Sequence, residues 1–200
     1  MQAAIDQFRV NIRYVRNMGA LHKALNAQTT NALDLSDILR AELVMAVSAL
    51  DKYIHDIVRY GMLEAYIGKR SRTKKFLQFS ITLGSVQVGI SAPTNINWLE
   101  EEIRNRHGWL SFQRADKISD AIHLFSDINI WAEVAKCIGK NAEDIKTQQN
   151  LIVDRRNCIA HEADIDPSYT GSRWTINDAM VDEAIDFIER VAEAIYIACK

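Results

Sequence analysis

The residues best suited to chemistry lie in the segment DRRNCIAHEADIDP, residues 154–167. On a helix, Asn157 and His161 share a face because they are four positions apart. Arg156 is about 140° around the helix axis from His161, but its side chain is long enough to bend toward the same pocket. Arginine binds phosphate oxygens, histidine exchanges protons near neutral pH, and an amide can position a substrate or a water molecule. These residue types indicate chemistry on a phosphodiester.

The same segment lacks the features of other common reaction types. It has no obvious metal cage, no activated serine or cysteine, and no glycine-rich phosphate loop. Four metal-ligand types follow one another near its end, but on a helix they point in several directions: His161, Glu162, Asp164 and Asp166. His107 and His123 occur without ligand spacing. We therefore expect neither a metal nor a cofactor.

The elements that must position these residues are helices. Only two prolines and eight glycines interrupt the chain, and most of the rest carries apolar residues at helical period. We predict an all-α bundle with long antiparallel helices at 2–26, 34–66, 96–107, 116–138, 142–164 and 176–199. The alternation in SVQVGIS predicts one short β-like excursion near 86–90.

Composition sets the class of protein. Two hundred residues with 48% hydrophobic content are enough for one core, so we predict a single domain, 1–200, with an N-terminal helical extension at 1–30. The net charge of −2 excludes a global basic field, so any nucleic-acid contact must use a local patch. Three cysteines without a C-x-x-C pair favour a reducing cytoplasm over a disulfide framework. No apolar stretch is long enough for a membrane span, and the N-terminus lacks the apolar segment of a signal peptide.

Local charges offer further candidates. The segment GKRSRTKKF is a loop or frayed helix end with five cations, which we take as candidate RNA contacts: Lys69, Arg70, Arg72, Lys74 and Lys75. The alternative is an ordinary solvated loop. A row of Arg9, Arg13 and Arg16 on the first helix is interpreted as a solvated face, with phosphate contact as the alternative. Asp51 lies at the edge of a core-facing stripe and should have a cationic partner.

The motif and its surroundings resemble a known family. RRNCIAH resembles the Arg-x4-6-His signature of the HEPN superfamily of helical ribonucleases, in the form where a polar residue follows the arginine. LRAELVMAVSALDKYIHDIV (39–58), SFQRADKISDAI (111–122) and RNCIAHEADID (156–166) are similar, in the same order, to RiboL-PSP-type HEPN domains. Together these segments give a family-like core over residues 36–199.

The resemblance implies a helical bundle that forms a homodimer, in which two Arg-His motifs meet and cut RNA without a metal ion. Arg156 and His161 would be catalytic, and Asn157 would position the phosphate or the imidazole. Asp51 would orient Arg156 or His161. Arg155 is left as a contact for the RNA backbone, because the polar residue of the family signature follows Arg156.

The residues also support the homodimer independently. Cleavage by attack of the ribose 2′-OH needs a base for that hydroxyl and an acid for the departing 5′-oxygen, yet one chain offers one well-placed histidine. A two-fold partner would supply the second.

Other interpretations stay open. The chain could be a non-catalytic HEPN protein that binds RNA or nucleotide, or a dimeric scaffold. It could be a toxin or phage-defence effector with an antitoxin or defence-system partner. HEPN toxins silenced by adenylylation resemble R-x4-H-x-Y, and Ala163 stands in place of that tyrosine. Finally, Arg156 and His161 could make buried polar contacts that pin the helix to its neighbours, for instance through Asp51.

Overall fold

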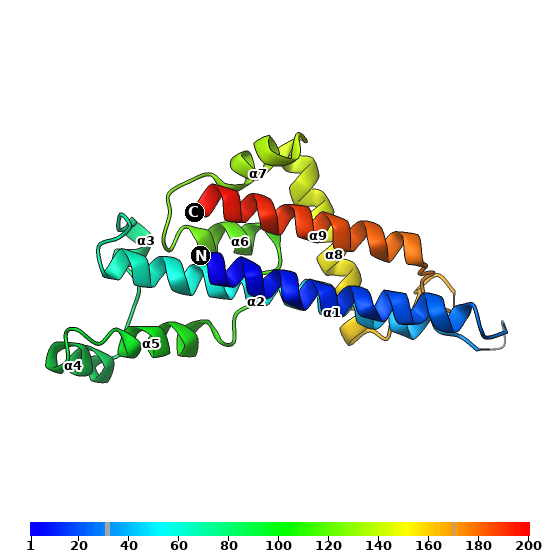
Figure 1. Ribbon diagram of the computed structural model, residues 1–200, viewed down its shortest axis with the longest axis horizontal. Helices are drawn as coiled ribbons and strands as arrows, with labels where there is room; N and C mark the ends of the chain where they lie inside the picture. The colour runs from blue at the N-terminus through cyan, green and yellow to red at the C-terminus, as the bar shows by residue number, and fades with distance from the viewer. Residues whose placement is uncertain (31–32, 170) are drawn as a thin grey trace.

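The computed structural model describes residues 1–30, 33–169 and 171–200, and these residues form a helical bundle (Figure 1). The helices in this part of the chain are α1 (Gln2–Asn26), α2 (Ser36–Tyr66), α3 (Lys74–Leu77), α4 (Leu83–Ser91), α5 (Asn97–His107), α6 (Ala115–Ile122), α7 (Ile130–Ile138), α8 (Ala142–His161) and α9 (Asp178–Cys199). The described residues contain no sheet, and their one β feature is an isolated bridge between Ile165 and Arg173. The predicted all-α class is confirmed.

Three long helices form the body of the molecule. α1 runs antiparallel to both α2 and α9, so that the two chain termini lie near each other (Figure 1). The apolar stripe of α2 fills the centre of this layer, with Leu50, Ile54 and Ile57 at most 1% exposed. Burial of these side chains removes a large apolar area from water, which is the main contribution to stability.

Ion pairs fix the register between α1 and α9. Arg9 Nε donates to Glu193 Oε1 at 2.7 Å, and Lys23 Nζ donates to Asp182 Oδ2 at 2.8 Å. Arg16 pairs with both Asp186 and Glu189. Two members of the arginine row on α1 therefore bind carboxylates of α9, which neither the solvated-face interpretation nor the phosphate interpretation anticipated.

The shorter helices are added to this body from two sides. α8 crosses the layer of long helices steeply. α4 and α5 form an arm that extends away from this layer near the C-terminal end of α2 (Figure 1). Ile145 and Val153 bury one side of α8 against the core. Beyond Val153, no residue of α8 is buried.

The predicted β-like excursion near 86–90 is wrong, because these residues lie in α4. The hydroxyl of Thr82 accepts a hydrogen bond from Ser85 N and caps the helix. Gly89 packs so closely on Trp98 that a Cβ there would lie 2.7 Å from the ring. The alternating valines misled because Val88 and Ile90 remain exposed instead of sharing a buried face.

The helix predicted at 116–138 is also wrong, because the chain forms α6 and α7 with a break between them. Phe125 lies in that break and is buried against the backbone of Gly61. Asn129 then caps α7 by accepting from Ala132 N at 3.2 Å. The predicted helix end at residue 138 is confirmed, and Gly139 follows it in a left-handed conformation, φ 73°.

The helix predicted at 142–164 ends at His161. Ala163 and Asp164 follow it with φ of 52° and 59°, a left-handed conformation that non-glycine residues rarely adopt. Asp164 N donates to Cys158 O at 3.0 Å and closes the helix end. Within the described ranges, no helix combines the length and apolarity that crossing a membrane requires.

Candidate functional site

The Arg-Asn-His trio predicted from the sequence comes together on one wall of an open hollow of about 710 Å³. We call this space the α8 hollow. Its lining comes from the loop after α5, from α6 and from α8: Trp109, Leu110, Ser111, Phe112, Gln113, Arg114, Lys117, Asp120, Val153, Arg156, Asn157 and His161. Arg156 does reach the face of Asn157 and His161, as its length suggested.

The trio is free to meet a ligand. Arg156 and Asn157 are half-buried and His161 is exposed. Among the residues that the structure describes, none forms a hydrogen bond or ion pair with these three side chains. This arrangement does not support the interpretation that Arg156 and His161 pin the helix in place.

Other residues of α8 hold the helix against its neighbours. Asn150 Oδ1 accepts from Ala115 N at 3.0 Å, and Gln149 Nε2 donates to Gln113 O at 2.8 Å. Asp154 pairs with Arg114. These contacts fix α8 against the start of α6 and the loop before it, so the position of the trio relative to the hollow is well determined.

Arg155, a candidate for RNA binding, points away from the α8 hollow. Its Nη2 donates to Asp164 Oδ2 at 2.9 Å, and Arg40 Nε donates to the same oxygen at 2.6 Å. Asp164 is fully buried. Arg40 also donates to the carbonyl of Trp174 at 2.8 Å. The guanidinium of Arg155 is thus engaged inside the protein, where it holds the chain that follows α8.

Asp51 lies beneath the hollow and supports its floor. It accepts from Phe112 N at 2.6 Å and from Gln113 Nε2 at 3.0 Å. The hydrogen-bond partners of this carboxylate are therefore a loop amide and a glutamine, and the imidazole of His55 lies 3.9 Å from it; the sequence suggested a cation. Asp51 makes neither of its hydrogen bonds to Arg156 or His161, so any influence on them passes through the loop.

The cations of the basic segment 69–75 have three kinds of surroundings. Arg70 Nη2 donates to Cys199 O at 2.8 Å, and Arg72 Nη2 donates to Tyr66 O at 3.1 Å, so both arginines bind the ends of long helices. Lys69 and Lys74 are exposed. Lys75 donates to Asp120 at 2.8 Å, and Asp120 lines the α8 hollow. Of these five cations, Lys75 is the one that the structure brings to the hollow.

Three residues of the hollow were missed by the sequence reasoning: Trp109, Arg114 and Lys117. Arg114 and Lys117 line the hollow with Arg156, and their side chains are 43% and 56% exposed; Arg114 is paired with Asp154, and Lys117 Nζ lies 3.7 Å from Asp116 Oδ2. Both lie in the family-like segment SFQRADKISDAI, which was the available signal. Trp109 precedes that segment, and nothing in its sequence context sets it apart.

Metal-ligand residues are arranged for other purposes. In the portion of the chain that is described, no three histidine, cysteine or acidic side chains gather as a metal-binding group. Asp164 binds two arginines, and Asp166 Oδ1 accepts from Ser168 N at 2.8 Å in the following turn.

The helical bundle and an Arg-polar-x3-His helix facing an open hollow are what the resemblance to HEPN domains implied. The family model for RiboL-PSP-HEPN matches residues 11–200, and the chain belongs to this family. The match begins inside α1, ahead of the core predicted to start at residue 36. No curated protein and no solved structure matches the chain.

Proposed function

We propose that this protein is an endoribonuclease that cleaves RNA by attack of the ribose 2′-OH and needs no metal ion. One observation carries the proposal. Arg156, Asn157 and His161 line a single open hollow while making no polar contact with the other described residues. A guanidinium, an amide and an imidazole that are unpaired and gathered on one open surface can all bind the same phosphodiester.

The chemistry follows from what each residue type can do. A base removes the proton of the 2′-OH, and the oxygen attacks the adjacent phosphorus. The bond from phosphorus to the 5′-oxygen breaks, and an acid protonates that oxygen. Products are a 2′,3′-cyclic phosphate and a 5′-hydroxyl. Arg156 stabilises the charge that develops on the phosphorane-like transition state, and Asn157 holds the phosphate or the imidazole.

The need for both a base and an acid supports a homodimer. His161 is the only histidine of the described residues that lines the α8 hollow. His55 and His107 lie instead on a second hollow between α2 and α5. With two-fold symmetry, His161 of one subunit would act as base and that of the other as acid.

The RNA substrate is recognised first by charge. Arg114, Lys117 and Arg156 line the hollow together with one carboxylate, Asp120, which is paired with Lys75. Arg114 is itself paired with Asp154, and Lys117 lies 3.7 Å from Asp116, so Arg156 is the cation of the hollow that pairs with no described carboxylate. A phosphate would bind Arg156 directly, and it would compete with the exposed carboxylates for Arg114 and Lys117, although the whole chain is slightly acidic. Toxin or phage-defence activity, with an antitoxin or defence-system partner, would follow from uncontrolled RNA cleavage.

Mixing two inactive variants tests the shared site. Arg156→Ala and His161→Ala should each lose cleavage, while mixed heterodimers recover part of it because their shared site keeps one Arg156 and one His161, whereas each variant homodimer has none of one kind. Mixtures that stay as inactive as either variant alone would argue against a shared site.

The cleaved ends test the chemistry separately. We expect 2′,3′-cyclic phosphate or its opened product, identified by mass spectrometry. Ends with 5′-phosphate and 3′-hydroxyl would contradict attack by the 2′-OH. A folded dimer that binds RNA and never cuts it would favour the non-catalytic binding or scaffold role.

A further inference from the structure

Trp109 is the most exposed of the four tryptophans; the next, Trp174, is 41% exposed. The side chain of Trp109 is 80% exposed, second only to Leu83 among the large apolar residues of the described chain. Trp131 is buried and donates to Ala115 O at 2.8 Å, and Trp98 stacks edge-on against Tyr66. A single exposed apolar residue is ordinary by itself. The position of Trp109 on the α8 hollow is what gives it meaning.

The loop that carries Trp109 is firmly held. His107 O accepts from Leu110 N at 2.8 Å, and the carbonyl of Leu110 lies 3.2 Å from His55 Nε2. Two positions further on, Asp51 holds Phe112 N. An aromatic ring on a backbone fixed from both sides loses little conformational entropy on binding, so it is suited to be a platform for a ligand.

The surroundings of Trp109 favour one ligand class. Arg114, Lys117 and Arg156 share its hollow. The cores of protein interfaces are depleted in lysine and acidic residues. Sites for single-stranded nucleic acid, in contrast, combine cations along the backbone with aromatic rings on which bases stack. Trp109 among these cations fits a nucleotide better than the apolar surface of a second copy.

We propose that Trp109 stacks on a nucleobase next to the phosphate held by Arg156. The proposal deepens the ribonuclease function and rests on it for the identity of the strand. It predicts that the substrate is single-stranded or looped RNA, because a base in a duplex is already stacked on its neighbours. Every base has a π-face, so the platform should accept all four with little preference.

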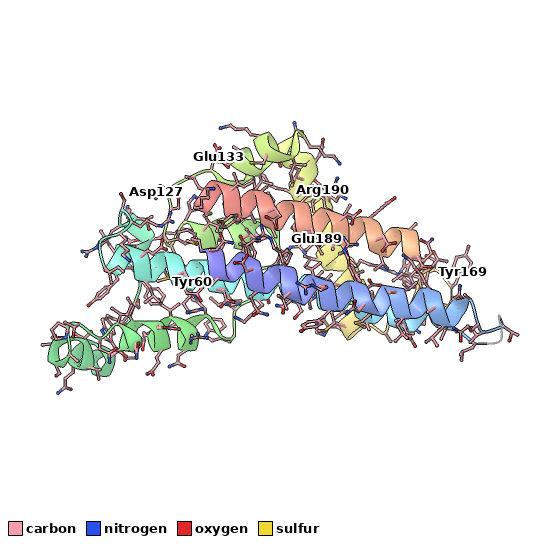
Figure 2. The ribbon with its side chains drawn as sticks, viewed as in Figure 1. Tyr60, Asp127, Glu133, Tyr169, Glu189 and Arg190 are labelled. Atoms are coloured by element: carbon pink, nitrogen blue, oxygen red, sulfur yellow. The ribbon has the colours of Figure 1, made fainter. Side chains whose placement is uncertain are left out.

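Binding of a short 2′-O-methyl RNA oligonucleotide tests the platform apart from cleavage, because its blocked hydroxyl cannot attack. We expect wild-type tryptophan fluorescence to be quenched on titration. Trp109→Phe should abolish the quench although Trp98, Trp131 and Trp174 remain. Trp109→Ala should weaken binding about tenfold or more. Tyr169→Ala is the matched control: its side chain is 68% exposed and lies at the far end of the bundle (Figure 2), so binding and quench should be unchanged.

An oligonucleotide with one abasic position identifies the contact as base stacking. Moving that position along the strand should reveal one site where the loss weakens wild type by about tenfold and leaves Trp109→Ala unaffected. Equal sensitivity of both proteins at every position would overturn the proposal.

The outcomes separate this inference from the nuclease function. Quenching without cleavage of RNA would keep the stacking platform and refute the nuclease. Cleavage by Trp109→Ala at the wild-type rate and KM, or no binding of the oligonucleotide at all, would refute the platform. If Trp109→Ala instead dissociates a dimer, measured by light scattering, while RNA affinity is unchanged, the ring contacts a second copy and the proposal fails.

Discussion

Two adjacent arginines of α8 have different surroundings, although the sequence presents them as near equivalents. Arg155 binds the buried carboxylate of Asp164, whereas Arg156 lines the α8 hollow and binds no described residue. The 100° turn between successive helical residues is enough to direct one arginine into the protein and the next into the hollow. Stability and activity should therefore respond oppositely at these two positions.

Arg155→Ala should lower the free energy of unfolding by about 2 to 3 kcal/mol. The loss is smaller than the roughly 3 to 5 kcal/mol of a fully broken buried pair, because Arg40 still binds Asp164. Arg156→Ala should stay within about 0.5 kcal/mol of wild type. Urea denaturation of both variants measures the contrast. A destabilised Arg156→Ala would revive the interpretation that Arg156 pins the helix.

Asp51→Ala should slow cleavage without unfolding the protein, because it releases the loop that carries Phe112 and Gln113. We expect kcat to fall roughly 10- to 100-fold, the cost of misplacing binding groups by about an ångström. Asp51→Asn keeps one oxygen for Phe112 N and should recover part of the rate. Ser48→Ala, on an exposed part of the same helix, is the control. Normal kcat in Asp51→Ala would show that the loop needs no such support.

At the scale of elements, the turn after α6 depends on a close approach to α2. Gly61 lies inside α2, and a Cβ added there would be 2.3 Å from Cγ of the buried Phe125. This contact sets the break between α6 and α7, and with it the end of α6 that carries Asp120 and the neighbouring Lys75.

Gly61→Ala should therefore destabilise the protein by about 2 kcal/mol or more, because overpacking outweighs the gain of about 1 kcal/mol from replacing glycine in a helix. Gly84→Ala provides the matched control, since no atom lies within 4 Å of the added Cβ. That variant should be as stable as wild type or slightly more stable. Thermal unfolding of both decides; equal Tm values would mean that Phe125 moves aside at no cost.

At the scale of the whole molecule, two buried titratable side chains make the stability of the fold depend on pH. Glu42 is 1% exposed, and burial, with a smaller contribution from the charge of Asp182, raises its pKa from 4.5 to about 7. Burial also lowers the pKa of His107 from 6.5 to about 4, with a smaller contribution from His55. Between pH 4.5 and 6.5 the unfolded chain holds a proton on His107 but not on Glu42, whereas the folded chain holds one on Glu42 but not on His107. The contributions of the two groups to stability therefore change in opposite directions with pH.

Glu42→Gln isolates one of them. A raised carboxyl pKa gives stability that is present below pH 4.5 and lost as pH rises through 7. The glutamine variant lacks this loss, so its stability relative to wild type should be greater at pH 8 than at pH 5, by an amount on the order of 3 kcal/mol. Urea denaturation at the two pH values measures the difference. A difference that is the same at both would mean that Glu42 titrates as it does in the unfolded chain.

The sequence predicted the long helices well because their apolar period is sustained over many turns. α1 was predicted at its observed bounds, and α2, α5, α8 and α9 within a few residues. α4 and the break after α6 failed because distant packing decides them: Gly89 on Trp98, and Phe125 on Gly61. Local pattern carries no record of such contacts.

The candidate site was predictable where it lies on one helix. Arg156, Asn157 and His161 share a helical face, and the structure places all three on one hollow. Arg114 and Lys117 come from another element, and the role of Asp51 depends on a loop that begins near residue 108. Residues joined only by tertiary structure have no spacing rule in the sequence, which is why these were missed or assigned other partners.

The most direct test of the central claim is cleavage of labelled single-stranded RNA, tRNA and sequence-matched DNA in EDTA, by wild type and by His161→Ala. We predict that wild type cuts RNA alone, since DNA lacks the 2′-OH, and that His161→Ala cuts neither while its circular dichroism stays helical. A strict requirement for magnesium, equal cleavage of DNA, or full activity in His161→Ala would contradict a metal-independent ribonuclease centred on the α8 hollow.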